Sequence, residues 1–339
     1  MPAEWEPQEA VMLTWPHPGT DWKPYLDDIQ GTCVELVEAI TQYENVIIAA
    51  QHPDDVAWQL SHIDAGRVSI YHVHTDDTWA RDHGPITLVD TAGGSLRLLD
   101  FRFNGWGEKF AADADNLITR TLFAQGAFSG QLETDDDFVL EGGSIETDGQ
   151  RTLFTTAQCL LAPHRNQPLS QAQIDTELKR RLGMERIVWL HHGNPIGDDT
   201  DGHIDTTVRL APDNTLLYVT TTPDDEQYDD FLALADELKA LRTADGTPYR
   251  LIPLPSPRPI YYDGERLPAT YANFLIINQA VIVPTYGQPD RDSEAMKAIG
   301  KAFPDRKIIG IDASVIIRQH GSIHCMTMQI ARPEGNEKM

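Results

Sequence analysis

The sequence predicts an α/β fold built from a repeated module, with the copies packed around a common axis. Strand-like and helix-like segments alternate along all 339 residues. Five polar signatures also recur at intervals of 52 to 70 residues, at Asp82, Glu141, His203, Asn273 and Cys325. The apolar strand AVMLTWP lies a similar distance before the first of them. Such a period is typical of repeat architectures, and packing around an axis would bring equivalent strand ends and their polar side chains together.

The first predicted helix covers residues 24–42, where apolar residues recur at helical spacing between Leu26 and Ile40. It leads into the strand NVIIAA. A second helix is predicted over residues 170–182, because Ser170 can cap its start and Gly183 can end it. The strand RIVWLH follows that helix.

Two further amphipathic helices are predicted over residues 224–242 and 292–303, before the strands YRLIPL and KIIGID. Hairpins are predicted where turn-forming pairs separate strand-like segments, at Asp148-Gly149 and near Asp213-Asn214.

The chain is predicted to form a single domain over residues 1–339. Its length alone would suggest two domains. However, no long linker rich in proline, glycine or serine divides it, and PLPSPRP at residues 253–259 is typical of a rigid loop between modules.

The composition is that of a soluble globular protein, with 41% hydrophobic and 23% charged residues. Lysine and arginine number 27 against 52 aspartate and glutamate, a net charge of −25. That charge disfavours nucleic acid and anionic membrane partners and favours a cationic small molecule, although it could equally serve solubility or a salty habitat.

Several features of the sequence favour a cytoplasmic location. No apolar run reaches the roughly 18 residues of a membrane helix. The opening MPAEWEPQEA has neither a basic leader nor an apolar core, so a secretory signal is not expected. Cys33, Cys159 and Cys325 are odd in number and widely spaced, which argues against a disulfide framework.

The densest polar cluster is DDTDGHIDTTV at residues 198–208. His203 and Asp205 are two residues apart, so they share a face of an extended segment. This arrangement suits a general acid/base beside a cation-binding carboxylate, and it also suits two ligands of a metal ion. His72 and His74 form a second pair that a metal site could use, although surface histidines are the commoner explanation.

Two other motifs carry candidate binding groups. In TWARDHGP, Trp79 could stack on a planar cation and Asp82 could accept two hydrogen bonds from it, unless Arg81 and Asp82 form a structural ion pair. In LEGGS, Glu141 stands at a strand end, and the two glycines after it allow a close backbone approach.

Cys325 could be a nucleophile or an inert buried thiol. Its neighbour His324 is a poor candidate for activating it, because adjacent residues of an extended segment point to opposite faces. His203 is the better candidate for the base.

The ordered motifs MPAEWEPQEAVMLTWP, TWARDHGP, RFNGWG, FVLEGGSIETDG, GDDTDGHIDT and SIHCMTMQ closely resemble those of one enzyme family. These are the agmatine deiminases and bacterial-type peptidylarginine deiminases of the guanidino-group-modifying superfamily. The resemblance runs from residue 1 to about residue 330. It implies a five-bladed α/β propeller, the pentein fold, made of ββαβ modules with pseudo-fivefold symmetry.

The resemblance also implies roles for six residues. Cys325 is the nucleophile, His203 the general acid/base, Asp82 and Asp205 the guanidinium-binding carboxylates, Glu141 the acid that supports the histidine, and Trp79 an aromatic neighbour of the substrate. The implied reaction needs no metal and no organic cofactor. Carboxylates around Cys325 should raise its pKa, so we hypothesise that the cationic substrate itself promotes ionisation of the thiol.

The leading expectation is hydrolysis of agmatine to N-carbamoylputrescine and ammonia, through a covalent thiouronium intermediate. Within the family, the alternative is deimination of peptidylarginine or of another small guanidine. A metal-dependent hydrolase and a non-catalytic guanidine binder are remote alternatives. Relatives of this kind are often oligomers, so a homo-oligomer is expected.

The sequence departs from the family pattern in loops expected to line the outer part of the pocket. RQHGSIHC has His320 and Ser322 at altered positions, and FNGWGEKF, DTDGHID and Gln8 are further departures. None of them removes the thiol, the histidine or the paired aspartates, so the departures concern substrate choice.

Overall fold

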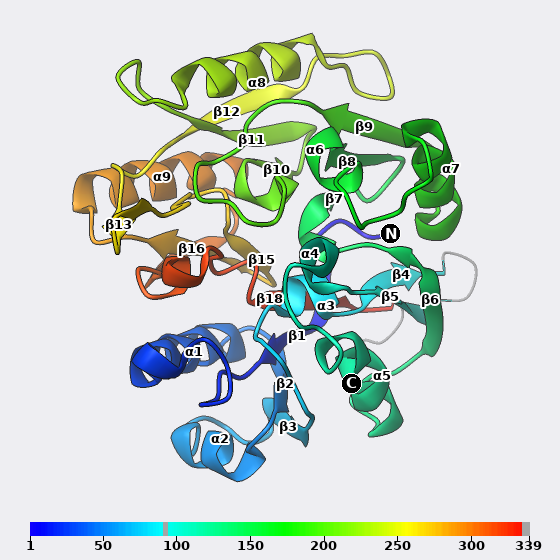
Figure 1. Cartoon of the computed structure of the whole chain (residues 1–339), viewed down its shortest axis with the longest axis vertical. Coiled ribbons are helices and arrows are strands. Elements are labelled where there is room, and N and C mark those ends of the chain that lie inside the picture. Colours follow the sequence, from blue (N-terminus) through cyan, green and yellow to red (C-terminus); the bar gives the residue numbers. More distant parts are fainter. Residues whose placement is uncertain (91–93, 334–339) are drawn as a thin grey trace.

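Five copies of one strand–strand–helix–strand unit make up the computed structural model, which describes residues 1–90 and 94–333 (Figure 1). In each unit the first two strands pair antiparallel, and the chain then returns through a helix to a third strand, parallel to the second. The ββαβ modules and the α/β propeller class implied by the sequence are confirmed.

Four modules are continuous in the sequence. Their elements, in chain order, are β4 (Ile86–Val89), β5 (Leu96–Arg102), α5 (Ile118–Ala124) and β6 (Gln131–Val139); β7 (Ile145–Thr147), β8 (Thr152–Thr156), α7 (Gln171–Leu182) and β9 (Arg186–Leu190); β10 (Val208–Ala211), β11 (Thr215–Thr220), α8 (Tyr228–Ala240) and β12 (Arg250–Pro255); and β15 (Leu275–Ile277), β16 (Ala280–Thr285), α9 (Pro289–Ala302) and β17 (Lys307–Asp312).

The remaining module is assembled from both ends of the chain. It contains β1 (Gln8–Thr14), α1 (Leu26–Thr41) and β2 (Asn45–Ala50), extended by α2 (Pro53–Gln59) and β3 (Val68–His72). Its first, antiparallel strand is β18 (Thr327–Ala331), which pairs with β1 at one edge of the sheet. The C-terminal strand thus joins the first module, as closure of a propeller requires.

The predicted helices form, and two of them have starts shifted by three or four residues. α7 has a capping box made by Ser170 and ends at Gly183, whose φ of 68° is left-handed. α9 begins at Pro289, earlier than predicted, because proline is well suited to the first helical turn. α8 begins at Tyr228, later than predicted, because Asp225 accepts the backbone N–H of Gln227 and holds the preceding turn.

Both predicted hairpins are present. β7 and β8 are joined through Gly149, whose φ is 73°, and the Asp148 carboxylate accepts nearby backbone N–H groups. β10 and β11 are joined through Asp213 and Asn214, both left-handed with φ of 58° and 52°. Such turns match the twist of the strands that they connect.

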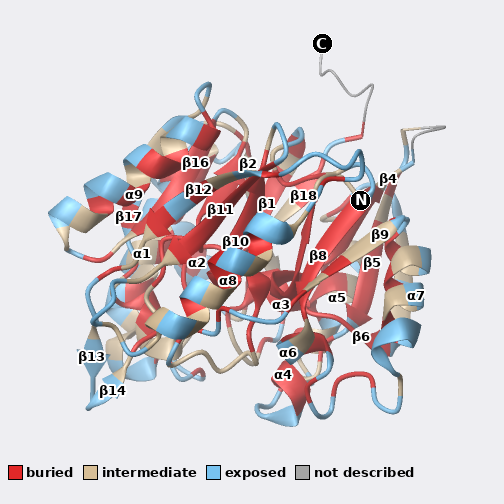
Figure 2. Cartoon of the chain, turned by 90° about the horizontal axis from the view of Figure 1, so that it is seen from above, coloured by how far each residue is buried: buried red, intermediate tan, exposed pale blue. Residues whose placement is uncertain are grey.

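The helices of the modules lie at the rim of the molecule and the short turns lie near its centre (Figure 1). The strands are mostly buried, whereas the outer faces of the helices are exposed (Figure 2). Within the described part of the chain, no helix is both long and apolar enough to cross a membrane. The α-helices and strands of the described residues are completed by three short helices and one hairpin: α3 (Ala80–His83), α4 (Gly105–Glu108), α6 (Ala157–Leu160), β13 (Tyr261–Tyr262) and β14 (Glu265–Arg266).

A short turn precedes the first strand of each module, and these turns carry the recurring polar residues. Asp82 lies in α3 before β4, Glu141 precedes the 3₁₀ turn before β7, and His203 precedes the one before β10. Asn273 and Cys325 occupy the corresponding places before β15 and β18. The loose period in the sequence therefore marks structurally equivalent positions.

Candidate active site

The five recurring polar residues and Asp205 are all buried, none more than 5% exposed. The contacts below bring the side chains of Asp82, His203, Asp205, Asn273 and Cys325 together, although they come from different modules. This confirms the expectation that equivalent strand ends converge. Their roles in the reaction are considered under the proposed function.

The Cys325 thiol lies between an amide and a carboxylate. Its Sγ is 3.3 Å from Asn273 Oδ1 and 3.9 Å from Asp205 Oδ2. The Cys325 backbone N–H also donates to Asn273 Oδ1, at 3.2 Å. Burial raises the pKa of this thiol well above its ordinary value, and the carboxylates of Asp205 and Asp82 raise it further. The thiol is therefore protonated when no cation is bound.

Asp82 is held by two hydrogen-bond donors. Its Oδ1 accepts the backbone N–H of Gly143 and its Oδ2 accepts the indole N–H of Trp106, both at 2.9 Å. Burial raises its pKa, and His203 opposes that shift. Each carboxylate oxygen has a second lone pair, so the group can still accept hydrogen bonds from a guanidinium. Arg81 does not pair with Asp82 but donates to Gln329, so the Arg81–Asp82 ion pair considered from the sequence is not formed.

Asp205 is fixed by His324. Its Oδ2 is 2.7 Å from His324 Nδ1, while its Oδ1 is buried without a partner. Burial alone would raise the pKa of Asp205, but the hydrogen bond and charge of His324 outweigh burial and lower it. Asp205 is thus an anion with one oxygen free for a cationic ligand.

His203 faces Asp82, with its Nδ1 3.6 Å from Asp82 Oδ1. Burial alone would lower its pKa, but the charge of Asp82, with a smaller contribution from the neighbouring Cys159, outweighs burial and raises it well above the ordinary value. Near neutral pH the imidazole therefore carries a proton that it can give up.

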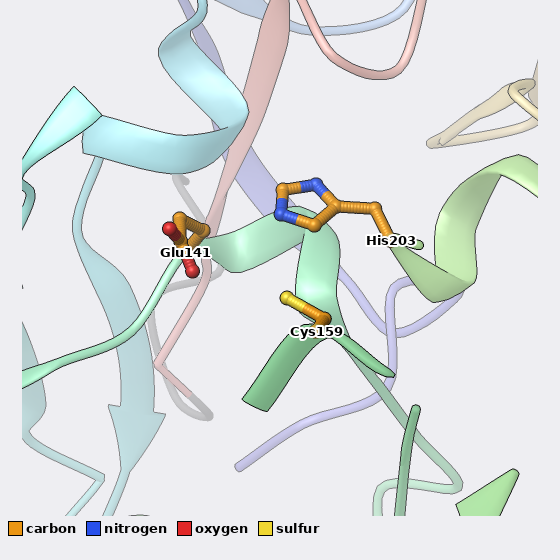
Figure 3. A group of neighbouring side chains, drawn as sticks. All are labelled: Glu141, Cys159 and His203. Atoms are coloured by element: carbon orange, nitrogen blue, oxygen red, sulfur yellow. The ribbon is translucent and has the colours of Figure 1, made fainter. Parts of the chain in front are cut away.

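Glu141 lies beside His203, as Figure 3 shows. Its Oε1 accepts Arg165 Nε at 2.9 Å in a fully buried ion pair, and its Oε2 has no hydrogen-bond partner. Ligand atoms of Glu141, His203 and Cys159 lie within 4.8 Å of one another.

Gly143 allows this close packing. A Cβ at that position would lie 2.6 Å from His203 Nδ1, 2.9 Å from Asp82 Oδ1 and 3.2 Å from Asp205 Oδ2. The second glycine of LEGGS is therefore the point at which the backbone approaches all three side chains.

His324 and Cys325 lie in a turn, not in the predicted extended segment. His324 pairs through Nδ1 with Asp205 Oδ2, the oxygen that also lies 3.9 Å from Cys325 Sγ. The Nε2 of His324 is 2.9 Å from Glu4 Oε2, which also accepts Arg209 Nη2 at 2.6 Å. Arg209 is fully buried and is also paired with Glu146. A buried charge network thus links the N-terminal segment to Asp205.

A narrow pocket of about 30 Å³ leads to Cys325. Trp79 lines it, packed against Gly321, and Trp79 also lies close to Trp22, with ring centroids 5.7 Å apart. The described residues that line the pocket include four aspartates and no lysine or arginine; they are Asp21, Asp77, Trp79, Asp82, Trp106, Phe110, Asp199, Thr200, Gln319, Gly321 and Cys325. Burial raises the pKa values of Asp77 and Asp199, each to about 6.

The loop that carries His320 and Ser322 does line the pocket, as expected, but these two side chains are not among the lining residues. His320 is left-handed, with φ of 66°, and its Nδ1 lies 2.7 Å from the Gly197 carbonyl oxygen. Ser322 is buried against the Tyr286 hydroxyl, at 3.0 Å. The neighbours Gln319 and Gly321 line the pocket instead.

The metal ligands considered from the sequence do not assemble. Among the described residues, two groups of three donor side chains lie close together, Glu141 with Cys159 and His203, and Glu4 with Glu146 and His324. Neither group contains Asp205, His72 or His74. His72 and His74 are exposed.

Three residues that contact the site had no role predicted from the sequence. The sequence marks Asn273 only as one of the polar residues that recur at similar intervals, and that spacing is the signal that could have indicated its place in the site. Trp106 and His324 are positioned by the packing of distant segments, and no local spacing indicates their partners. His324 and Asp205 are 119 residues apart in the sequence.

The Porphyromonas-type peptidyl-arginine deiminase family model matches residues 1–331. The chain belongs to this family. An agmatine deiminase from Pseudomonas aeruginosa is 33% identical, the alignment covering 98% of this chain and 95% of the relative. The family resemblance read from the motifs is confirmed, as is the enzyme class, a C–N hydrolase acting on guanidino groups.

Solved structures of the family superpose closely. A candidate arginine deiminase from Porphyromonas gingivalis is 48% identical, with a TM-score of 0.92 and 98% of each chain covered. A substrate-bound cysteine-to-serine variant of C. jejuni agmatine deiminase is 39% identical, with a TM-score of 0.90, covering 98% of this chain and 96% of that one.

Proposed function

We propose that the protein hydrolyses agmatine to N-carbamoylputrescine and ammonia. The observation that carries the proposal is that Asp82 lines the acidic pocket together with the Cys325 thiol, while the Asp205 carboxylate contacts the same thiol. Paired carboxylates can hold the planar guanidinium by its N–H groups and keep its charge in place. The thiol lies on the same site, where it can reach the guanidinium carbon.

Binding of the cation prepares the nucleophile. The same carboxylates that raise the pKa of Cys325 are neutralised by a guanidinium, so the thiol loses its proton when substrate is present. The thiolate then attacks the guanidinium carbon. His203, protonated at rest, donates its proton to the departing nitrogen, which leaves as ammonia.

The covalent thiouronium intermediate is then hydrolysed. His203, now neutral, accepts a proton from water, and the resulting hydroxide attacks the same carbon. The C–S bond breaks, Cys325 is released, and the product carries a ureido group. The proton that Cys325 gives up on substrate binding passes to solvent, where it converts the released ammonia to ammonium. The hydroxyl proton of the second adduct passes to the departing Cys325 sulfur, which restores the thiol beside a protonated His203.

The pocket favours agmatine over the alternatives. Agmatine carries an ammonium at the end opposite its guanidinium, and Asp21, Asp77 and Asp199 offer carboxylates in the same pocket as Cys325. Free arginine would bring its carboxylate into that acidic region, which is repulsive. A peptide would have to keep its backbone outside the narrow pocket. Deimination of peptidylarginine, or of another small guanidine, therefore ranks second.

We propose further that residues 1–339 work as one catalytic domain, because the thiol and its partners come from different modules. The three cysteines of the chain are free thiols, which supports work in a reducing compartment such as the cytoplasm.

A colorimetric assay for ureido product tests the proposal on agmatine, arginine, and peptides with internal or C-terminal arginine. We expect agmatine to give the highest kcat/KM. Cys325→Ala should abolish the activity, whereas Cys33→Ala, a buried thiol of α1, should retain it. Equal or greater activity on the peptides would overturn the agmatine assignment. Loss of activity after exhaustive chelation would revive the metal-dependent alternative.

A further inference from the structure

Three potential metal ligands lie together on the side of His203 that faces away from Asp82. Glu141, Cys159 and His203 are at most 1% exposed, and their ligand atoms lie within 4.8 Å of one another. In Figure 3 the Cys159 sulfur, the Glu141 carboxylate and one edge of the imidazole turn toward a common point. His203 Nδ1 faces Asp82, so the other ring nitrogen is the one on this side.

The position of Cys159 is fixed by the fold. It lies in α6, whose first turn is capped by Thr156, and Thr156 Oγ1 accepts the Cys159 backbone N–H at 3.3 Å. The same hydroxyl donates to the Gly202 carbonyl at 2.6 Å. Because Gly202 directly precedes His203, the thiol and the imidazole are held by one short chain of hydrogen bonds.

The carboxylate and the imidazole of this cluster have polar atoms without a hydrogen-bond partner. Glu141 Oε2 and both ring nitrogens of His203 are buried without a hydrogen-bond partner. A buried polar atom without a partner is costly, so a cation that binds the Glu141 oxygen and, once its proton has left, the outward ring nitrogen of His203 would relieve that cost.

The second cluster of donors provides a contrast. Glu4, Glu146 and His324 also lie within 4.8 Å of one another, but the guanidinium of Arg209 donates to both carboxylates. Their lone pairs are already used by a resident cation. In the cluster behind His203, Arg165 pairs with Glu141 Oε1, but Glu141 Oε2 has no hydrogen-bond partner, so a carboxylate oxygen stays available to a cation.

We propose that Glu141, Cys159 and His203 form an inhibitory site for a soft divalent cation of the Zn²⁺ class. The inhibition rests on the proposed function, because it requires His203 to be the acid/base of the reaction. Thiolate and imidazole together favour Zn²⁺ or Co²⁺, whereas Mg²⁺ and Ca²⁺ prefer oxygen ligands.

The proton balance explains the inhibition. On binding, the Cys159 thiol gives up its proton to solvent, the His203 imidazolium gives up one proton, and the freed ring nitrogen donates its lone pair to the metal. The other ring nitrogen keeps its hydrogen. The imidazole is then neutral and cannot accept a second proton, so it cannot take a proton from water to complete the catalytic cycle. Because the donors are buried, we expect the cation to enter slowly, so the inhibition should develop with time.

Metal binding is tested directly on the intact enzyme, by equilibrium dialysis against buffered Zn²⁺ after long incubation. We expect wild type, Cys33→Ser and Cys325→Ala to bind one tight Zn²⁺, and Cys159→Ser and Cys159→Ala to bind at least about 10-fold more weakly. With Co²⁺, a thiolate-to-metal absorption band should appear in Cys325→Ala and disappear in Cys159→Ser. Thermal unfolding identifies any variant that fails to fold, and two substitutions of Cys159 guard against that outcome.

Inhibition is measured separately, as loss of ureido formation with time of exposure to Zn²⁺. Wild type and Cys33→Ser should be inhibited and Cys159→Ser resistant by about 10-fold or more, while Mg²⁺ should have no effect. Unchanged Zn²⁺ affinity in both Cys159 variants, or its loss in Cys325→Ala, would overturn the site. Zn²⁺ bound through Cys159 without inhibition would overturn the inhibitory role. Absence of deimination on every guanidine would instead reject the proposed function, while the dialysis result would still decide the metal site.

Discussion

Replacement of Gly143 by alanine should damage the proposed catalytic geometry directly. A Cβ there would lie 2.6 Å from His203 Nδ1, whereas ordinary contacts of such atoms begin at 3.4 Å. The imidazole or the backbone must therefore move by about 0.8 Å, and the carboxylate of Asp82 must move as well. A misplacement of about 1 Å at a catalytic group costs about 100-fold in rate, equivalent to about 2.7 kcal/mol of transition-state stabilisation.

We expect Gly143→Ala to lower kcat/KM for agmatine by about 100-fold in the ureido assay. The loss of unfolding free energy should stay within about 1 to 3 kcal/mol, the usual range for overpacking. Gly31→Ala is the matched control, because Gly31 is an exposed residue of α1 and a Cβ there meets nothing within 4 Å. That variant should gain about 0.5 to 1 kcal/mol of stability and keep its activity. A Gly143→Ala enzyme that retains wild-type kcat/KM would refute the argument that this glycine sets the spacing of the site.

Three other expectations follow from the same geometry. Trp106→Phe removes the indole donor to Asp82 but keeps an aromatic ring. The value of kcat/KM should fall by about 10-fold or more, because a hydrogen bond to a charged group contributes about 1.5 to 3 kcal/mol. An unchanged kcat/KM would mean that this hydrogen bond is dispensable. Iodoacetamide should alkylate Cys325 slowly at neutral pH, because burial and two carboxylates raise the pKa of the thiol. A non-reacting guanidinium ligand should accelerate alkylation at the same pH. A bound ligand that gives no acceleration would contradict substrate-promoted ionisation. The pKa values of Asp77 and Asp199 are about 6, so these carboxyls are anions above that pH and neutral below it. The KM for agmatine should therefore rise as the pH falls through 6. A KM that is independent of pH between 5 and 7 would exclude these two residues as ligands of the ammonium group.

The modular fold could be predicted from the sequence because its signals are local. Helical spacing of apolar residues, the Ser170 cap and the turns at Gly149 and Asn214 each act within a few residues of the chain. The spacing of the polar signatures then indicated a repeat. It also indicated which residues converge, since equivalent positions in modules around an axis must meet.

The hydrogen-bond partners of these residues could not be predicted in the same way. Trp106 reaches Asp82 because of a left-handed turn in α4, where Trp106 itself has φ of 56°. The placement of His320 and Ser322 away from the pocket likewise depends on which segment each of them packs against. A motif gives the order of residue types, but it does not determine the orientation of each side chain.

The sequence by itself determined the module, the order of the modules and the identity of the thiol, the histidine and the carboxylates. Only the tertiary structure decided that His324 fixes Asp205 and that Cys159 lies behind His203. The physical reason is distance along the chain. Local preferences are encoded within a few residues, whereas these contacts exist only once all the modules have packed around the axis.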